Sequence, residues 1–65
     1  MDFKISLKAA RTNADMTQKE AAKLLNVDKS TIASWEKGKT QPKYTQGVKL
    51  SEIYGIPYDY INFLV

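Results

Sequence analysis

Residues 17–36 constrain the fold more than any other segment, because they have the pattern of two short helices joined by a tight turn. Thr17 and Glu20 stand at the spacing at which each side chain caps the other's backbone at the start of a helix. Asn26 tolerates the left-handed backbone that ends a helix, and Asp28 is a favourable N-cap for the next one. The segment therefore predicts a pair of crossing helices.

The second helix of this pair has one apolar side and one small, polar side. Ile32 and Trp35, three residues apart, predict a stripe that faces the protein, so Trp35 is expected in the core rather than stacked on a ligand. The opposite side carries small, polar or basic residues, namely Lys29, Ser30, Ala33, Ser34 and Lys37. A helix packed from behind with such an outer side is suited to the major groove of DNA.

The net positive charge lies on this second helix and the loop after it. The chain has a formal net charge of +3. Residues 29–43 hold four lysines and one glutamate, whereas residues 1–28 hold five basic and four acidic residues, and residues 44–65 one lysine and two acidic residues. A solvated basic loop would look the same if the cluster stood alone. Together with the helix pair, the cluster favours nucleic acid as the partner.

Further helices are expected on either side of the pair, and no segment alternates with the period of a strand. The spacing of apolar residues predicts helices over residues 3–13, 17–26, 28–38 and 44–54, with a short fifth helix from Pro57. The expected inward residues are Leu7 and Ala10 with Phe3 or Ile5, Ala21 and Ala22 with Leu24 or Leu25, Val48, Leu50 or Ile53, Tyr54, Ile56 and Ile61.

The chain resembles the helix-turn-helix domain of phage Cro proteins and lambda-type repressors over residues 4–63. The matching positions are Gln18, Ala22, Ile32, Trp35, residues 36–42 and residues 54–60. The resemblance implies an all-α fold, a compact five-helix bundle of the lambda-repressor-like DNA-binding type, in a single domain of residues 1–65. Two positions depart from the pattern of the family. Asn26 replaces the usual glycine of the turn. Gly47 stands where leucine is common, so the fourth helix is expected to pack differently or to start late.

The site residues follow from the outer side of the second helix and from the resemblance. The residues expected to read bases are Lys29, Ser30, Thr31, Ala33 and Ser34. Those expected to contact phosphates are Gln18, Lys37, Lys39, Thr40 and Lys43, and the resemblance places Gln18 and Lys39 first. Arg11 and Glu36 are expected to form a structural ion pair, and the resemblance also allows Arg11 to contact a phosphate. Lys19, Lys23 and Lys49 are expected only to aid solubility.

The C-terminal residues are more apolar than one thin helix requires. Residues 56–65 include seven apolar residues. Ile56 and Ile61 are expected to close the core, which leaves an apolar patch at Pro57, Tyr58, Phe63 and Leu64, with Tyr60 also an interface candidate. The resemblance implies a symmetric dimer contact at this end. The alternative is that these side chains fold back on their own core.

Composition excludes several classes of protein. The chain has no cysteine and no histidine, which argues against a disulfide framework and a metal site. No apolar run approaches the roughly 20 residues of a membrane helix, and no signal peptide is evident, so a cytoplasmic location is expected, in a bacterial cell or a phage-infected host and near the nucleoid. The sequence contains no glycine-rich phosphate loop and no paired carboxylates, which are features that would indicate an enzyme.

The sequence therefore predicts a transcription regulator that binds double-stranded DNA. The expected protein is a Cro-like repressor that binds an inverted-repeat operator as a homodimer, without a cofactor, a small-molecule substrate, or room for a sensor domain. The alternative is a helix-turn-helix protein-interaction module, such as an antitoxin or an antirepressor, which would need fewer lysines on the second helix.

Overall fold

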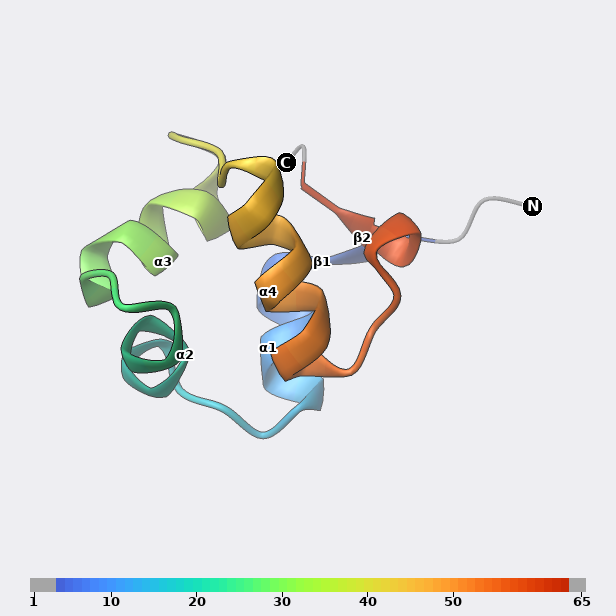
Figure 1. The fold of residues 1–65 in the computed structure, drawn as a ribbon, viewed down its shortest axis with the longest axis horizontal. Helices are drawn as coiled ribbons and strands as arrows, with labels where there is room; N and C mark the ends of the chain where they lie inside the picture. The colour runs from blue at the N-terminus through green and yellow to red at the C-terminus, as the bar shows by residue number, and fades with distance from the viewer. Residues whose placement is uncertain (1–3, 64–65) are drawn as a thin grey trace.

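The computed structural model describes residues 4–63, which form four α-helices, one 3₁₀ turn and two short strands. In chain order these are β1 (Ile5–Ser6), α1 (Leu7–Asn13), α2 (Gln18–Leu25), α3 (Lys29–Lys37), α4 (Tyr44–Tyr54), η1 (Tyr58–Tyr60) and β2 (Ile61–Asn62). Helices α2 and α3 pack against each other at one end of the long axis, and the two strands lie at the other end (Figure 1). Helices α1 and α4 lie between them.

The predicted count of five helices is wrong, because the C-terminal segment forms a single 3₁₀ turn and a strand. Strand β2 pairs in parallel with β1, and Ile5 is opposite Ile61. The first helix also starts later than predicted, at Leu7, because the Ser6 hydroxyl caps it by accepting the Ala9 amide at 3.1 Å. Phe3 lies outside the described residues. Two-residue strands are too short to show an alternating pattern.

Both ends of α2 and the C-terminal end of α3 form as the sequence predicts. The Glu20 amide donates to the Thr17 hydroxyl at 3.0 Å, and the Thr17 amide donates to the Glu20 carboxylate at 2.8 Å. The second bond lowers the pKa of Glu20, because it stabilises the ionised form. Asn26 is left-handed with φ 59°, and Gly38 ends α3 with φ 76°. Asp28 occupies the N-cap position of α3, but its side chain forms no capping bond.

The core is small and is shared by all four helices and β2. Its buried residues are Leu7, Ala10, Ala21, Ala22, Ile32, Trp35, Leu50, Tyr54 and Ile61. One choice left open by the sequence is settled here: Leu25 packs against this core, whereas Leu24 is 51% exposed. Among the described residues no helix is long and apolar enough to cross a bilayer.

Gly47 makes room for aromatic side chains from the C-terminal segment. Helix α4 starts at Tyr44, the predicted residue, and therefore not late, and Gly47 is buried. A Cβ atom at Gly47 would lie 3.0 Å from Cε2 of Tyr58 and 3.3 Å from Cζ of Phe63. The ring of Tyr58 also lies 5.2 Å from that of Tyr44 and 4.9 Å from that of Phe63, measured between centroids. A leucine at this position would displace these rings. Gly47, which replaces the leucine common in the family, therefore provides the space that the aromatic side chains of the C-terminal segment occupy.

Candidate nucleic-acid interface

Helix α3 is fixed on one side and open on the other. Ile32 and Trp35 are 1% and 4% exposed and anchor it in the core. Lys29 and Ser30, in its first turn, are exposed. Thr31, Ala33 and Ser34 are partly buried, so they offer less surface than Lys29 and Ser30 do. The side chains best placed for a ligand are therefore those at the start of the helix.

A basic surface continues from α3 into the loop before α4. Lys37, Lys39, Thr40 and Lys43 are all exposed. The left-handed backbone of Gly38 turns the chain out of α3 between the first two of these residues. Within residues 4–63, none of the four lysines from Lys29 to Lys43 forms an ion pair. Their charges are thus available to an anionic partner.

A hydrogen-bonded network joins the ends of α1, α2 and α3 behind this surface. Arg11 donates from Nε to Oε2 of Glu36 at 2.6 Å and from Nη2 to Oε1 at 3.3 Å. Its Nη1 donates to the Met16 carbonyl at 2.8 Å. Gln18, expected at a phosphate, donates from Nε2 to Oε1 of Glu36 at 3.0 Å. The side chains of Arg11 and Glu36 are only 12% and 5% exposed, so this pair is largely shielded from solvent.

The network and the core alter the acidity of two neighbouring groups. The hydrogen bond to Glu36 raises the pKa of Arg11, against the opposing effect of burial. Burial raises the pKa of Tyr54 to about 12, the negative charge of Glu36 adds to this increase, and the positive charge of Arg11 opposes it. Tyr54 therefore packs as a neutral phenol beside the ion pair.

Stability should fall at alkaline pH because of Tyr54. An unfolded tyrosine loses its proton near pH 10, whereas Tyr54 in the folded protein keeps its proton up to about pH 12. The stabilising contribution is thus complete below pH 10 and is lost as the pH rises from 10 to 12, a change of about 2–3 kcal/mol in the free energy of unfolding. Urea denaturation of the unaltered protein and of Tyr54→Phe at pH 9–12 measures it. Parallel stability curves for the two proteins would contradict the assignment.

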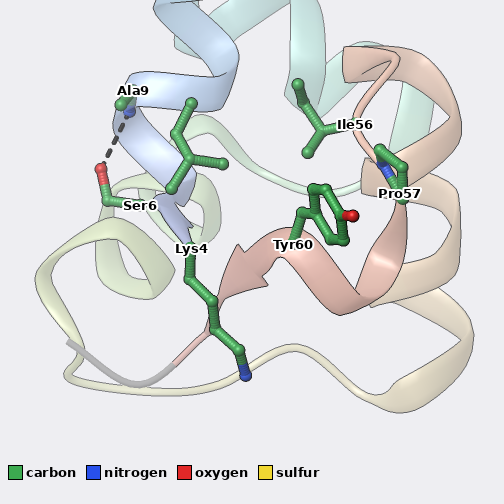
Figure 2. A pocket seen from close by; sticks show the side chains of 7 residues that line it. Lys4, Ser6, Ala9, Ile56, Pro57 and Tyr60 are labelled. Carbon is green, nitrogen blue, oxygen red and sulfur yellow. Dashed lines mark hydrogen bonds between the residues drawn. The ribbon is translucent and has the colours of Figure 1, made fainter. Parts of the chain in front are cut away.

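The end of the molecule opposite α3 carries an open apolar cavity of about 460 Å³. Its lining residues are Lys4, Ile5, Ser6, Ala9, Ile56, Pro57 and Tyr60. Figure 2 shows Ile56, Pro57 and Tyr60 on one side of this cavity and Ser6 and Ala9 on the other.

The residues expected at a dimer contact lie in different surroundings. Pro57 is exposed, whereas Tyr58 and Phe63 are partly buried against Gly47. Leu64 lies outside the described residues. Tyr60 is 60% exposed at the edge of the cavity.

Comparison with known proteins assigns the family. The helix-turn-helix family matches residues 7–61, nearly the whole described chain. The chain belongs to this family. The resemblance to the Cro and lambda-repressor group is thereby confirmed, and the family is one of DNA-binding regulators rather than enzymes, as the sequence predicts.

Two relatives share this helix-turn-helix region. The chain is 38% identical over 55 residues to the HTH-type transcriptional regulator ImmR of Bacillus subtilis (strain 168), an alignment that covers 85% of this chain and 43% of ImmR. It is 34% identical over 55 residues to the cryptic phage CTXphi transcriptional repressor RstR of Vibrio cholerae, covering 85% of this chain and 50% of RstR. The chain thus spans about half the length of either relative.

Sequence reasoning missed two features of this helix-turn-helix surface. The contact between Gln18 and Glu36 joins residues 18 positions apart, and no local spacing points to it. The bond from Arg11 to the Met16 carbonyl is also invisible in the sequence, because its acceptor is backbone. Both bonds draw polar side chains behind the interface into a single network.

Proposed function

We propose that this chain is the DNA-binding domain of a transcription regulator and places α3 in the major groove of double-stranded DNA. The observation that carries the proposal is the two-sided character of α3, with Ile32 and Trp35 in the core and Lys29 and Ser30 exposed. The names of the two relatives, a transcriptional regulator and a transcriptional repressor, support it. Its place of action would be the cytoplasm of a bacterial cell or phage-infected host, at the nucleoid.

The proposed contacts divide into base readout and phosphate binding. Lys29 has a flexible donor that suits guanine O6 and N7, and Ser30 can donate or accept. Thr31, Ala33 and Ser34 have shorter side chains than Lys29, and we propose that they contact the bases when the helix lies deep in the groove. The proposed phosphate contacts are Gln18, Lys37, Lys39, Thr40 and Lys43, all of them exposed except Gln18, which is partly buried.

The proposal is tested by selection of bound duplexes from a random-sequence DNA pool, followed by two variants. Lys29→Ala should relax discrimination at one base position and cost about 1–3 kcal/mol for the preferred base, since it removes a base contact. Lys39→Ala should weaken binding to all sequences alike, since it removes a phosphate contact. The slope of the logarithm of the binding constant against the logarithm of the salt concentration should become shallower by about one unit. Affinities are measured by fluorescence anisotropy over a range of salt concentrations.

Two results would contradict this assignment. Equal, sequence-independent losses in both variants would mean that Lys29 does not read a base. If no sequence is enriched even at low salt, the domain is instead a protein-interaction module of the antitoxin or antirepressor type, because such a module needs no operator.

We further propose that the protein binds an inverted repeat as a Cro-like repressor, with two copies related by a two-fold axis. One helix reads too few base pairs to select an operator among many competing sites. Two copies double the readout and place their α3 helices about 34 Å apart on one face of the duplex. The apolar C-terminal end is the proposed contact, at Pro57, Tyr58, Phe63 and Leu64. The exposed ring of Tyr60 extends it.

Tyr60→Asp tests the dimer without disturbing the core. Tyr60 is 60% exposed, whereas Tyr58 and Phe63 also pack against Gly47, so their replacement would affect folding as well. Tyr60→Asp should leave the melting temperature and the affinity for an isolated half-site unchanged. It should weaken binding to the full operator by about 100-fold, because cooperative binding of the second copy is lost. Unchanged cooperativity would show that this end is not the dimer contact.

A further inference from the structure

The hydrogen bond between Gln18 and Glu36 fixes the orientation of the Gln18 carboxamide. An ionised carboxylate only accepts hydrogen bonds, so the nitrogen of the amide, not its oxygen, must face Glu36. The structure has this arrangement, with Nε2 3.0 Å from Oε1. The same Oε1 atom accepts from Nη2 of Arg11 at 3.3 Å. One N–H of Nε2 is therefore committed to the protein, and the second remains for another acceptor.

This second N–H lies in a part of the domain that is rich in available donors. Gln18 is the first residue of α2 and is partly exposed. The Glu20 amide is capped by the Thr17 hydroxyl, and the Ala21 amide bonds to the Thr17 carbonyl. The amides of Gln18 and Lys19 come before these first bonds of the helix, where the helix dipole also favours an anion. An acceptor at this end of α2 can thus meet backbone and side-chain donors together.

A carboxylate so close to this surface would repel a phosphate if it were not neutralised. Arg11 makes two hydrogen bonds to Glu36, one of them at 2.6 Å, so the pair carries no net charge. Nη1 of Arg11 is held by the Met16 carbonyl. Arg11 is only 12% exposed, and Nε, Nη1 and Nη2 of its guanidinium each donate a hydrogen bond within the protein.

We propose that Glu36 is a positioning residue for DNA binding: its carboxylate, neutralised by Arg11, holds the Gln18 carboxamide so that the second Nε2 hydrogen is presented to a backbone phosphate. This inference rests on the proposed DNA-binding function and extends it. The ion pair is then part of the binding machinery as well as of the fold, although neither partner touches DNA.

A double-mutant cycle on DNA affinity tests the proposal. Gln18→Ala should lower the affinity for every duplex about tenfold, the effect expected for one hydrogen bond to a charged acceptor. Glu36→Asp withdraws the carboxylate by one methylene, which lengthens or breaks its hydrogen bond to Nε2 of Gln18. It should therefore lower affinity by a similar factor. In the Glu36→Asp background, Gln18→Ala should then change affinity less than twofold. Far-UV circular dichroism and thermal melting check that each variant is folded.

Lys39→Ala is the matched control, because Lys39 is a proposed phosphate contact outside the network. It should lower affinity by the same factor in both backgrounds. If Gln18→Ala keeps its full tenfold effect in the Glu36→Asp background, the positioning role is refuted while the DNA-binding function stands. If the unaltered protein binds no duplex, both are refuted.

A second measurement avoids substitutions in the network and applies if Glu36→Asp does not fold. Hydrogen exchange of the Gln18 side-chain amide is followed by ¹⁵N NMR in the unaltered protein. One of the two Nε2 protons should exchange slowly in the free protein, and the other should become slow only when DNA binds. Rapid exchange of both protons in the free protein, or no change on adding DNA, would overturn the proposal.

Discussion

Trp35→Ala is expected to leave most of the protein unfolded at 25 °C. The side chain is 4% exposed and contributes to a core of only nine buried hydrophobic residues among those described. Removing a buried tryptophan costs about 3–5 kcal/mol, because both its transfer free energy and its packing contacts are lost. A domain of this size has few kcal/mol to lose. Urea denaturation followed by far-UV circular dichroism measures the change in the free energy of unfolding.

Trp35→Phe is the control, since it keeps an aromatic ring in the same site and should retain a folded majority. The informative contrary result is a stable Trp35→Ala protein that no longer binds DNA. That result would mean that Trp35 contacts DNA, and that its burial in the core is not what holds α3 in place.

Arg11→Met should destabilise the domain by about 3–5 kcal/mol, because it leaves the carboxylate of Glu36 without its cation. Glu36 is 5% exposed, and Gln18 alone would then hydrogen-bond to it. The double variant Arg11→Met with Glu36→Met should recover most of this loss, since no unpaired charge then remains in the protein.

Urea denaturation of both proteins measures the difference between them. Equal instability of the single and the double variant would show that the loss comes from the backbone contact of Arg11 with Met16 instead of from the ion pair.

The helix pair could be predicted from sequence because its determinants are local. The capping box at Thr17 and Glu20 and the left-handed turn at Asn26 each depend on residues within one helical turn. The inward position of Ile32 and Trp35 follows from a three-residue spacing in the same helix. These features hold whatever the remainder of the chain does.

The ends of the described chain could not be predicted, because their structure depends on distant partners. Ile5 forms a strand only by pairing with Ile61. The segment after Pro57 forms one 3₁₀ turn before the chain enters β2, so the expected fifth helix is absent there. Gly47 is understood only when Tyr58 and Phe63 are seen against it, since nothing in its own neighbourhood in the sequence calls for a glycine.

The candidate site was predicted as a set of residues and not as an arrangement. The sequence pattern predicted the outer side of α3, and the structure shows that its residues differ in exposure, with Lys29 and Ser30 exposed and Thr31 partly buried. It also marked Gln18 but not the partner that orients it, because hydrogen bonds between helices depend on how the helices cross. The roles of these residues toward DNA remain predictions that the variants above test.

The pairing of β1 with β2 has a consequence for how the chain acquires its structure. Ile5 meets Ile61, so the first and last described elements are joined, whereas α2 and α3, the most extensively packed pair of helices, follow each other directly in the chain. Bringing together two segments so far apart in sequence costs more conformational entropy than packing two adjacent helices. We therefore expect the helices to assemble quickly and the strand pair to form last. During synthesis, β1 would have to wait for nearly the whole domain to leave the ribosome before its partner arrives.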